Sequence, residues 1–394
     1  MVWVSIYAMM GIVLAIAALM MRSLVRRGRV WSAMVVLPAL WVAVEWLRYR
    51  TTPHGTAGSL AYTQLKFLPF LQLASITGPW GMTFFLLLFE SAIAIAIYLW
   101  QRDRRRAIRV FSAGCAATAL VLLYGAVRLT LPEGKTMRVG LIASDVRENL
   151  VPTEEGKATE RLYRDYAAAA DRLAADGAEA IVMPEKLGVI VDPDTRPMDR
   201  ELQMLADRTG AVIVAGVVRV STPLKYNEAR TYVPHAEIAS YDKEHMLPPF
   251  ESDLEPGKTL TLVSRSHQTL GVAICKDMDF PRPARSYGEA GATVLLVPAW
   301  DFVVDNLWHG HIAVMRGVED GFSVVRAAKG GYLTVSDWRG KIVAEQRSDA
   351  ATFATLLADV PAEHHSTPYQ RLGDWFAWLA IGILVFAVAR LVLP

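Results

Sequence analysis

The sequence predicts a membrane protein made of α-helical membrane segments and one α/β globular domain. Two observations carry this prediction. Hydrophobic residues make up 53% of the 394 residues, which is more than an ordinary soluble domain contains. Long apolar stretches also gather near both ends of the chain, whereas charged residues recur throughout the middle. Crossing a bilayer requires about 20 mostly apolar residues in a helix, because lipid offers no partner to an open backbone amide.

The apolar stretches predict about four transmembrane helices within residues 1–130 and one at 375–393. The candidate spans are residues 2–21, 30–47, 80–100, 110–127 and 375–393, with an outer loop near 48–79. Arginines fill the first and third short loops, which predicts that these loops are cytoplasmic. The loop near 48–79 and the globular domain then lie on the outer, periplasmic side. Inside the second span, Glu45 needs a partner, and Arg48 is expected to supply it.

Residues 136–361 are predicted to form the globular domain. Its apolar runs of strand length alternate with helical patterns, which is typical of an α/β fold with mixed strand directions. The expected helices are 154–175, 198–208, 282–290 and 312–320. The expected strands are 137–143, 178–183, 211–220, 236–241, 259–263, 269–274, 293–297, 323–328, 332–336 and 342–345.

Several classes of function are disfavoured by charge and residue spacing. The net charge of +2 gives no reason to expect a nucleic-acid partner. The cysteines, Cys115 in a predicted span and Cys275 in the globular domain, are not expected to form a disulfide. His309 and His311 are two residues apart and do not share a helix face, so we predict no metal site. No cofactor is predicted, and the oligomeric state is left open.

Three polar residues stand where apolar strands end, a common place for catalytic groups in α/β sheets. They are Glu185, Lys243 and Cys275. Each alone has an ordinary structural explanation, but together they supply a proton acceptor, a positive group for an oxyanion and a nucleophile. We expect the lysine to favour the thiolate and burial to raise the pKa of the carboxyl. The backbone N–H of Lys276 is the expected second oxyanion donor.

The segments that hold these residues resemble motifs of a known superfamily. Residues 181–185 (IVMPE), 241–245 (YDKEH) and 271–275 (GVAIC), in this order, resemble the Glu-Lys-Cys triad of the nitrilase (carbon-nitrogen hydrolase) superfamily, and the resemblance covers the whole domain. It implies an α-β-β-α sandwich with Glu185 as general base, Lys243 as oxyanion stabiliser and Cys275 as nucleophile. Residues 315–319 (MRGVE) and 325–327 (VRA) resemble its later arginine segments.

The flanking apolar segments narrow the resemblance to the apolipoprotein N-acyltransferase family. Residues 41–48, 61–64 and 367–369 are similar to its membrane helices, outer loop and approach to the last helix. Residues 248–251 (PPFE) resemble its Pro-Phe-Gly-Glu element, which makes Glu251 an additional active-site carboxylate. Lys276 and Asp277, expected to support the site, stand where the family carries Tyr-Glu, and residues 328–330 replace Asn-Thr-Gly. The membrane part is shorter by roughly two or three helices.

The resemblance implies a transferase of lipoprotein biosynthesis in the bacterial inner membrane. A phospholipid acyl donor would acylate Cys275 as a thioester, and a lipoprotein N-terminus or other amine acceptor would receive the acyl group. Trp300 and Asp301 are candidate substrate contacts. Two alternatives stay open: a membrane-anchored amidase with the same triad, in which water attacks the acyl-enzyme, and a non-catalytic membrane scaffold.

Overall fold

The computed structural model describes residues 2–146, 157–192, 196–304 and 306–392. The chain divides into two compact units. The first, here called the helical unit, contains Met1–Thr52, Gly58–Leu131 and Arg371–Pro394. The second, here called the sandwich unit, contains Pro53–Ala57 and Pro132–Gln370. Residues 154–156 of a predicted helix and residue 393 of the last predicted span lie outside the described residues.

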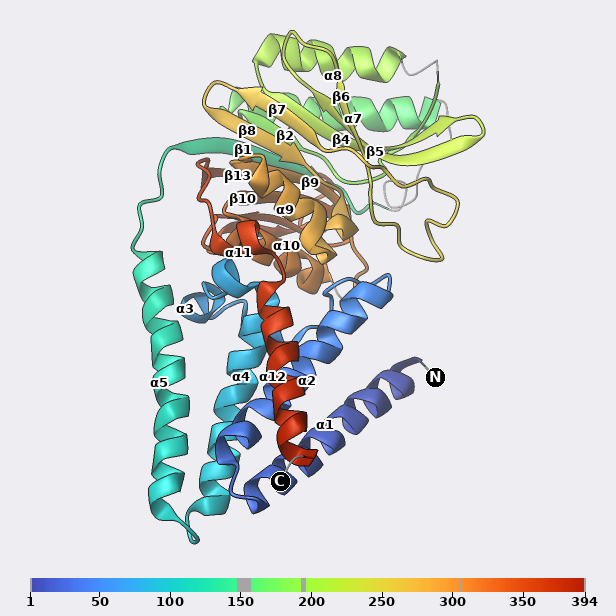
Figure 1. The fold of residues 1–394 in the computed structure, drawn as a ribbon. Coiled ribbons are helices and arrows are strands. Elements are labelled where there is room, and N and C mark those ends of the chain that lie inside the picture. The colour runs from blue at the N-terminus through green and yellow to red at the C-terminus, as the bar shows by residue number, and fades with distance from the viewer. Residues whose placement is uncertain (1, 147–156, 193–195, 305, 393–394) are drawn as a thin grey trace. The chain divides into compact units, whose positions relative to one another are not determined.

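The helical unit has a long helix over each of the five predicted apolar stretches. These helices are α1 (Val2–Arg26), α2 (Val30–Thr51), α4 (Ala74–Leu99), α5 (Arg104–Leu129) and α12 (Trp375–Val392) (Figure 1). By length and composition, α2, α4, α5 and α12 are able to cross a membrane. Two short helices, η1 (Leu60–Gln64) and α3 (Leu68–Leu71), lie between α2 and α4. Helix α4 is kinked at Gly78, which has a φ of 62° and precedes Pro79, so the predicted span begins just after the kink.

Glu45 on α2 is held by neutral donors, and the prediction that Arg48 is its partner is wrong. The Glu45 carboxylate accepts hydrogen bonds of 2.7–3.0 Å from four groups. The donors are Trp41 Nε1, Ser59 Oγ, the Leu60 backbone N–H and Thr83 Oγ1. They come from α2, from the start of η1 with the residue before it, and from α4. The carboxylate therefore ties the segment between α2 and α4 to these two helices through neutral donors, without a second charge.

The sandwich unit contains two mixed β-sheets. The seven-stranded sheet has the order β13-β1-β2-β4-β5-β6, with β3 paired to β4, and the six-stranded sheet has the order β12-β11-β10-β9-β8-β7. The strands of the first sheet are β1 (Thr136–Ala143), β2 (Ala180–Val182), β3 (Val189–Val191), β4 (Val212–Ser221), β5 (Leu224–Tyr232), β6 (Ala239–Asp242) and β13 (Ala354–Pro361). Those of the second are β7 (Thr261–Arg265), β8 (Gln268–Val272), β9 (Val294–Trp300), β10 (Ser323–Lys329), β11 (Tyr332–Ser336) and β12 (Ile342–Arg347).

Alternating side chains on these strands build three apolar layers. Val139 of β1 and Leu296 of β9 belong to one core cluster between the two sheets. On the outer face of the first sheet, Ile213 packs with α7 (Lys157–Ala175) and α8 (Arg196–Thr209). On the outer face of the second sheet, Leu295 packs with α9 (Pro281–Glu289) and α10 (Asn306–Asp320). Because neighbouring residues of a strand face opposite sides, helices cover both outer faces, and the predicted α-β-β-α sandwich is confirmed (Figure 1).

The structure adds three strands that the sequence did not predict: β3, β5 and β13. Strand β5 has the sequence LKYNEARTY, with buried polar residues where a strand pattern would require apolar ones. Its Glu228 accepts from Arg219 of β4, and its Arg230 pairs with Asp199 of α8. These buried charges are tolerated because each has an opposite partner.

A short segment near the N-terminus of the chain also packs in the sandwich unit. Pro53–Ala57 lies against η2 (Cys275–Asp279), a 3₁₀ turn at the end of β8. The backbone N–H and the hydroxyl of Thr56 both donate to the Asp279 carbonyl, at 2.8 and 2.7 Å. Gly55 has a φ of +54°, and a Cβ there would lie 2.5 Å from the same carbonyl oxygen. Only glycine allows this close approach.

Candidate active site

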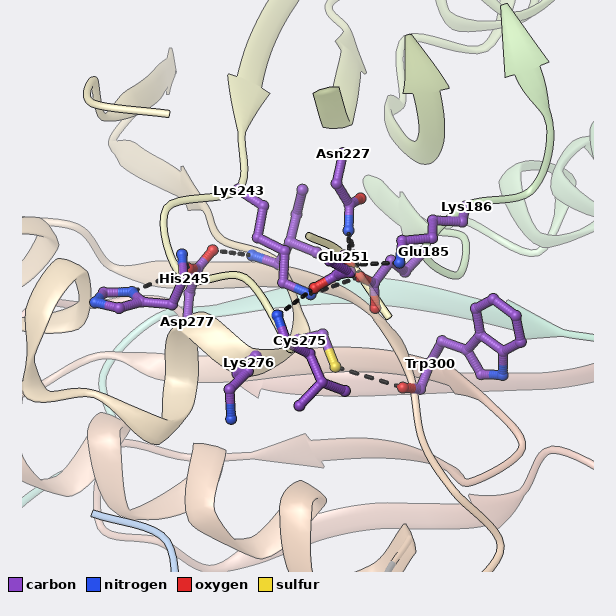
Figure 2. A network of polar contacts seen from close by, with 12 residues as sticks. Glu185, Lys186, Asn227, Lys243, His245, Glu251, Cys275, Lys276, Asp277 and Trp300 are labelled. Atoms are coloured by element: carbon purple, nitrogen blue, oxygen red, sulfur yellow. Dashed lines mark hydrogen bonds and ion pairs between the residues drawn. The ribbon is translucent and has the colours of Figure 1, made fainter. Parts of the chain in front are cut away.

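The sandwich brings the three predicted catalytic residues together at the carboxyl ends of three strands. Glu185 follows β2, Lys243 follows β6 and Cys275 follows β8. Figure 2 shows Glu185 and Lys243 in one polar network with Glu251, Asn227 and Lys186, and the Cys275 thiol beside it, hydrogen-bonded to the Trp300 carbonyl. The carboxylate and the ammonium are buried, with exposed fractions of 2% each, and the thiol is half-buried.

Cys275 is the first residue of η2 and has an unusual backbone conformation. Its φ of 41° lies in the left-handed region, which costs a residue with a Cβ roughly 1–2 kcal/mol. The sharp turn between β8 and η2 directs the thiol toward the neighbouring strand. Sγ donates to the carbonyl oxygen of Trp300, at the end of β9, over 3.5 Å (Figure 2).

Glu185 lies in a tight turn that packs against β4. Its Oε1 accepts from Lys243 Nζ at 2.9 Å and from Asn227 Nδ2 at 2.5 Å. The backbone of Gly216 on β4 touches this turn so closely that a Cβ there would lie 2.5 Å from the Glu185 Cα. The next residue, Lys186, has a φ of 51°. Close packing and two charged or polar donors therefore fix the carboxylate in one orientation.

Lys243 Nζ bridges two carboxylates. It lies 2.9 Å from Glu185 Oε1 and 2.9 Å from Glu251 Oε2. Glu251 also forms an ion pair with Lys186 and accepts from Asn227 Nδ2 at 2.8 Å. The buried network thus contains two carboxylates and two ammonium groups, with a neutral amide between the carboxylates. This balance of charge lets ionised groups persist in a dry site.

The charges in the network set the protonation state of the resting site. Burial raises the pKa of Glu185, but Lys243 and Lys186 outweigh it and hold that pKa well below its usual range. Burial lowers the pKa of Lys243, but the charges of Glu185, the Cys275 thiolate and Glu251 favour the ammonium and outweigh it, so the net shift is upward. Burial and the Glu185 charge raise the pKa of Cys275 more than Lys243 and Arg326 lower it.

One expectation about pKa direction is therefore wrong: the pKa of the Glu185 carboxyl is lowered, whereas the sequence predicts a raised one. Lys243 does favour the Cys275 thiolate, as predicted, but burial and the Glu185 charge outweigh it and the pKa of the thiol is raised. In the structure the resting site holds a neutral thiol beside an ionised carboxylate and an ammonium. A thiol in this state needs a proton acceptor at the moment of attack, and Glu185 is the ionised group whose charge acts on it most strongly.

Asp277 connects the nucleophile turn to the segment that follows Lys243. Its fully buried carboxylate accepts from the backbone N–H groups of Glu244, His245 and Ile274 at 2.8–3.1 Å. It also accepts from Tyr241 Oη at 2.9 Å. These donors lie on both sides of the site, so Asp277 joins the segment that contains Lys243 to the turn that contains Cys275; its supporting role in the site stays a prediction.

Lys276, Trp300 and Asp301 lie around the cysteine in different settings. The Lys276 ammonium is buried and pairs with Asp279 at 3.2 Å. Both oxygens of Asp301 accept from the guanidinium of Arg326, at 2.5 and 2.7 Å. The half-buried Trp300 offers its carbonyl to Cys275 and its ring to Lys329. The substrate-contact roles of Trp300 and Asp301 stay predictions.

Sequence reasoning missed three residues that the structure places in the site. Asn227 lies on β5, a strand that the polar sequence concealed. Lys186 follows Glu185 directly and reads as a surface charge in the sequence. Lys329 ends β10 within residues 328–330, where the family resemblance leads one to expect Asn-Thr-Gly, and this departure was the available signal.

Comparisons with known proteins find relatives of both parts of the chain. The family model described as carbon-nitrogen hydrolase matches residues 155–366, and the apolipoprotein N-acyltransferase N-terminal domain matches residues 1–92. The apolipoprotein N-acyltransferase of Geobacter metallireducens is 28% identical over 96% of this chain and 78% of its own length. That of Vibrio parahaemolyticus is 26% identical over 90% of this chain and 74% of its own.

Solved structures show the same fold for the sandwich. An amidase of Nesterenkonia sp. AN1 in complex with butyramide superposes with a TM-score of 0.51 at 22% sequence identity. The match covers 61% of this chain and 95% of that structure.

Proposed function

We propose that this chain, which belongs to the carbon-nitrogen hydrolase family, transfers a fatty acyl group from a phospholipid through a Cys275 thioester to an amine. The observation that carries the proposal is the convergence of Glu185, Lys243 and Cys275 in a chain whose N-terminal part matches the apolipoprotein N-acyltransferase N-terminal domain. The amine acceptor we propose is the N-terminus of an apolipoprotein, as the names of the curated relatives indicate.

In the first step, the Cys275 sulfur attacks the ester carbonyl carbon of the phospholipid. Glu185 takes the thiol proton as the C–S bond forms, because its carboxylate is ionised while the thiol is not. The oxyanion is stabilised by the Lys243 ammonium and the Lys276 backbone N–H. Collapse of the tetrahedral intermediate breaks the ester C–O bond, and the leaving alkoxide takes the proton from Glu185. A lysophospholipid leaves and the thioester remains.

In the second step, the neutral amine of the acceptor attacks the thioester carbonyl carbon. Glu185 takes a proton from the amine as the C–N bond forms, and the same positive group holds the oxyanion. The C–S bond then breaks and the sulfur recovers a proton from Glu185. The products are an amide and the free thiol, so the site returns to its resting charge.

Glu251 and Asp277 act on this chemistry as positioning residues. Glu251 shares the Lys243 ammonium with Glu185, which prevents Lys243 from moving fully onto the base. Asp277 holds the backbone beside Lys243 and Cys275. The chain is a membrane protein, and we further propose that it lies in the bacterial inner membrane with the sandwich unit on the periplasmic side, because arginines fill the opposite loops.

A labelling experiment tests the proposal. The purified full chain is incubated with phospholipid that carries a labelled acyl group, and the protein is analysed for a thioester sensitive to neutral hydroxylamine. Label is expected on the wild type and to be absent from Cys275→Ser. Adding a diacylated lipopeptide with a free N-terminus should move the label to the peptide. Release of the label only as free fatty acid would favour the hydrolase, and no label on folded wild type would contradict the proposal.

A further inference from the structure

Lys329 is a buried lysine that touches the turn of the general base. It ends β10, pairs in register with Trp300 of β9, and is fully buried. Its Nζ donates to the Lys186 carbonyl oxygen over 3.0 Å and lies 4.0 Å from the centroid of the Trp300 ring. The Trp300 carbonyl in turn accepts from the Cys275 thiol. One side chain thus reaches both the base turn and the residue beside the nucleophile.

Other backbone hydrogen bonds also hold the turn around Glu185, but their groups lie before and after the Lys186 carbonyl. Glu185 N–H donates to the Ala299 carbonyl at 3.2 Å, and Gly216 N–H donates to the Pro184 carbonyl at 3.1 Å. Leu187 N–H donates to the Gly216 carbonyl at 2.8 Å. Between them, Lys186 has a left-handed backbone with a φ of 51°. The Lys329 ammonium binds the carbonyl of this strained residue, directly after the base.

We propose that Lys329 is a positioning residue that holds the Glu185 turn in the orientation needed to take the Cys275 proton. The inference rests on the proposed function for its consequence in catalysis, although the contacts are independent of the substrate. A carbonyl bound by an ammonium is held about twice as strongly as one bound by a neutral donor. The left-handed conformation of Lys186 costs energy, so it persists only where surrounding contacts hold it.

The charge of Lys329 gives this role a pH signature. Burial is the main cause that lowers the pKa of Lys329 to about 7. The Lys186 charge also lowers this pKa, whereas the Glu185 and Asp145 charges raise it. Among the residues that the structure describes, those three carry the charges that act on the ammonium. Below this pKa the ammonium is charged and binds the carbonyl strongly. Above it the neutral amine binds more weakly, so the benefit that depends on Lys329 should decline as the pH rises.

The test measures alkylation of Cys275 by iodoacetamide in the purified full chain, with Cys275→Ser reporting the background from Cys115. Lys329→Met should slow alkylation by between about tenfold and a hundredfold, the factor that a misplaced reacting group costs. Lys329→Gln keeps a donor without charge and should fall between. The ratio of wild-type to Lys329→Met rates should decrease as the pH rises through 7. Lys341→Met, on an exposed lysine, is the matched control.

The decisive comparison repeats the variant in a Glu185→Gln background. If Lys329 acts through the base, Lys329→Met should cause no further slowing there, because the two changes remove one shared interaction. An equal loss in both backgrounds, or no loss in the first, overturns the inference. If Lys329→Met does not fold, as judged by its thermal unfolding, the same comparison with Lys329→Gln decides. Failure of the wild type to form a thioester would contradict the proposed function alone, since alkylation needs no lipid.

Discussion

Replacing Asn227 by aspartate should convert the balanced carboxylate network into one that depends on pH. In the wild type, one Asn227 amide nitrogen donates to Glu185 Oε1 at 2.5 Å and to Glu251 Oε1 at 2.8 Å. A carboxylate oxygen in that place would face two negative charges. At an effective dielectric constant of about 20, charges roughly 3 Å apart repel by about 5 kcal/mol. The introduced carboxyl should therefore keep its proton, with a pKa well above its usual value.

The sign of the pH dependence follows from this raised pKa. An aspartate in the unfolded chain loses its proton near pH 3.9, whereas the folded Asn227→Asp variant keeps it to higher pH. The folded state then binds more protons, so the free energy of unfolding falls as the pH rises from about 4 to the raised pKa. At low pH the single O–H replaces two donated bonds, and the lost bond costs about 1.5–3 kcal/mol.

The assay is thermal unfolding of the purified chain in detergent between about pH 5 and pH 8, with thioester formation measured on the same samples. Asn227→Asp should lose stability relative to wild type as the pH rises, and acylation should fall with it. Asn227→Leu, of similar size and without charge, should show a penalty that does not change with pH. Equal unfolding midpoints for Asn227→Asp and wild type across this range would refute the reasoning.

Three further changes test other contacts. Gly216→Ala should slow acylation by about a hundredfold and cost about 1–3 kcal/mol of unfolding free energy, because its Cβ would lie 2.5 Å from the Glu185 Cα. Asp277→Asn should cost about 2–4 kcal/mol in chemical unfolding, since an amide has one acceptor oxygen for four donors. Glu45→Leu should lower the unfolding free energy in bilayer vesicles by about 2 kcal/mol, because each of its four hydrogen bonds contributes about 0.6 kcal/mol in a membrane. The stability of Glu45→Gln should lie between those of the wild type and Glu45→Leu.

Each of these has a contrary outcome. Wild-type acylation by Gly216→Ala would mean that the base turn moves freely. Unchanged unfolding of Asp277→Asn would show that water replaces the lost acceptor. A Glu45→Gln variant less stable than Glu45→Leu would indicate that the charge itself is required.

Most strands could be predicted from the sequence because apolar periodicity survives wherever a strand has a buried face, whereas the arrangement of layers was implied by the resemblance to the nitrilase superfamily. Strands such as β9 can be recognised in the sequence by their continuous apolar runs. Strand β5 cannot, because its buried positions include Asn227 and Glu228, whose partners Glu185 and Arg219 lie on or next to other strands of the sheet. A pattern based on hydrophobicity cannot find a strand that is stabilised by buried charge pairs.

The same limit applies to the site. Glu185, Lys243 and Cys275 stood out because each ends an apolar strand and matches a motif. The direction of the pKa shifts could not be read from residue types, because it depends on how many charges surround each group. Asp301 was predicted from its position after a strand, yet only the fold shows that Arg326 takes both of its oxygens. Long-range pairing of this kind leaves no local signal.

The docking of Pro53–Ala57 on η2 bears on how the catalytic half of the chain can be studied in isolation. A soluble fragment beginning at Pro132 would remove Thr56 and leave the Asp279 carbonyl, at the end of the nucleophile turn, without its two donors. Such a fragment would contain Glu185, Lys243 and Cys275 but would lack the two hydrogen bonds from Thr56 that hold the turn of Cys275. Supplying the missing pentapeptide, grafted by a linker, is the way to recover a faithful truncated enzyme.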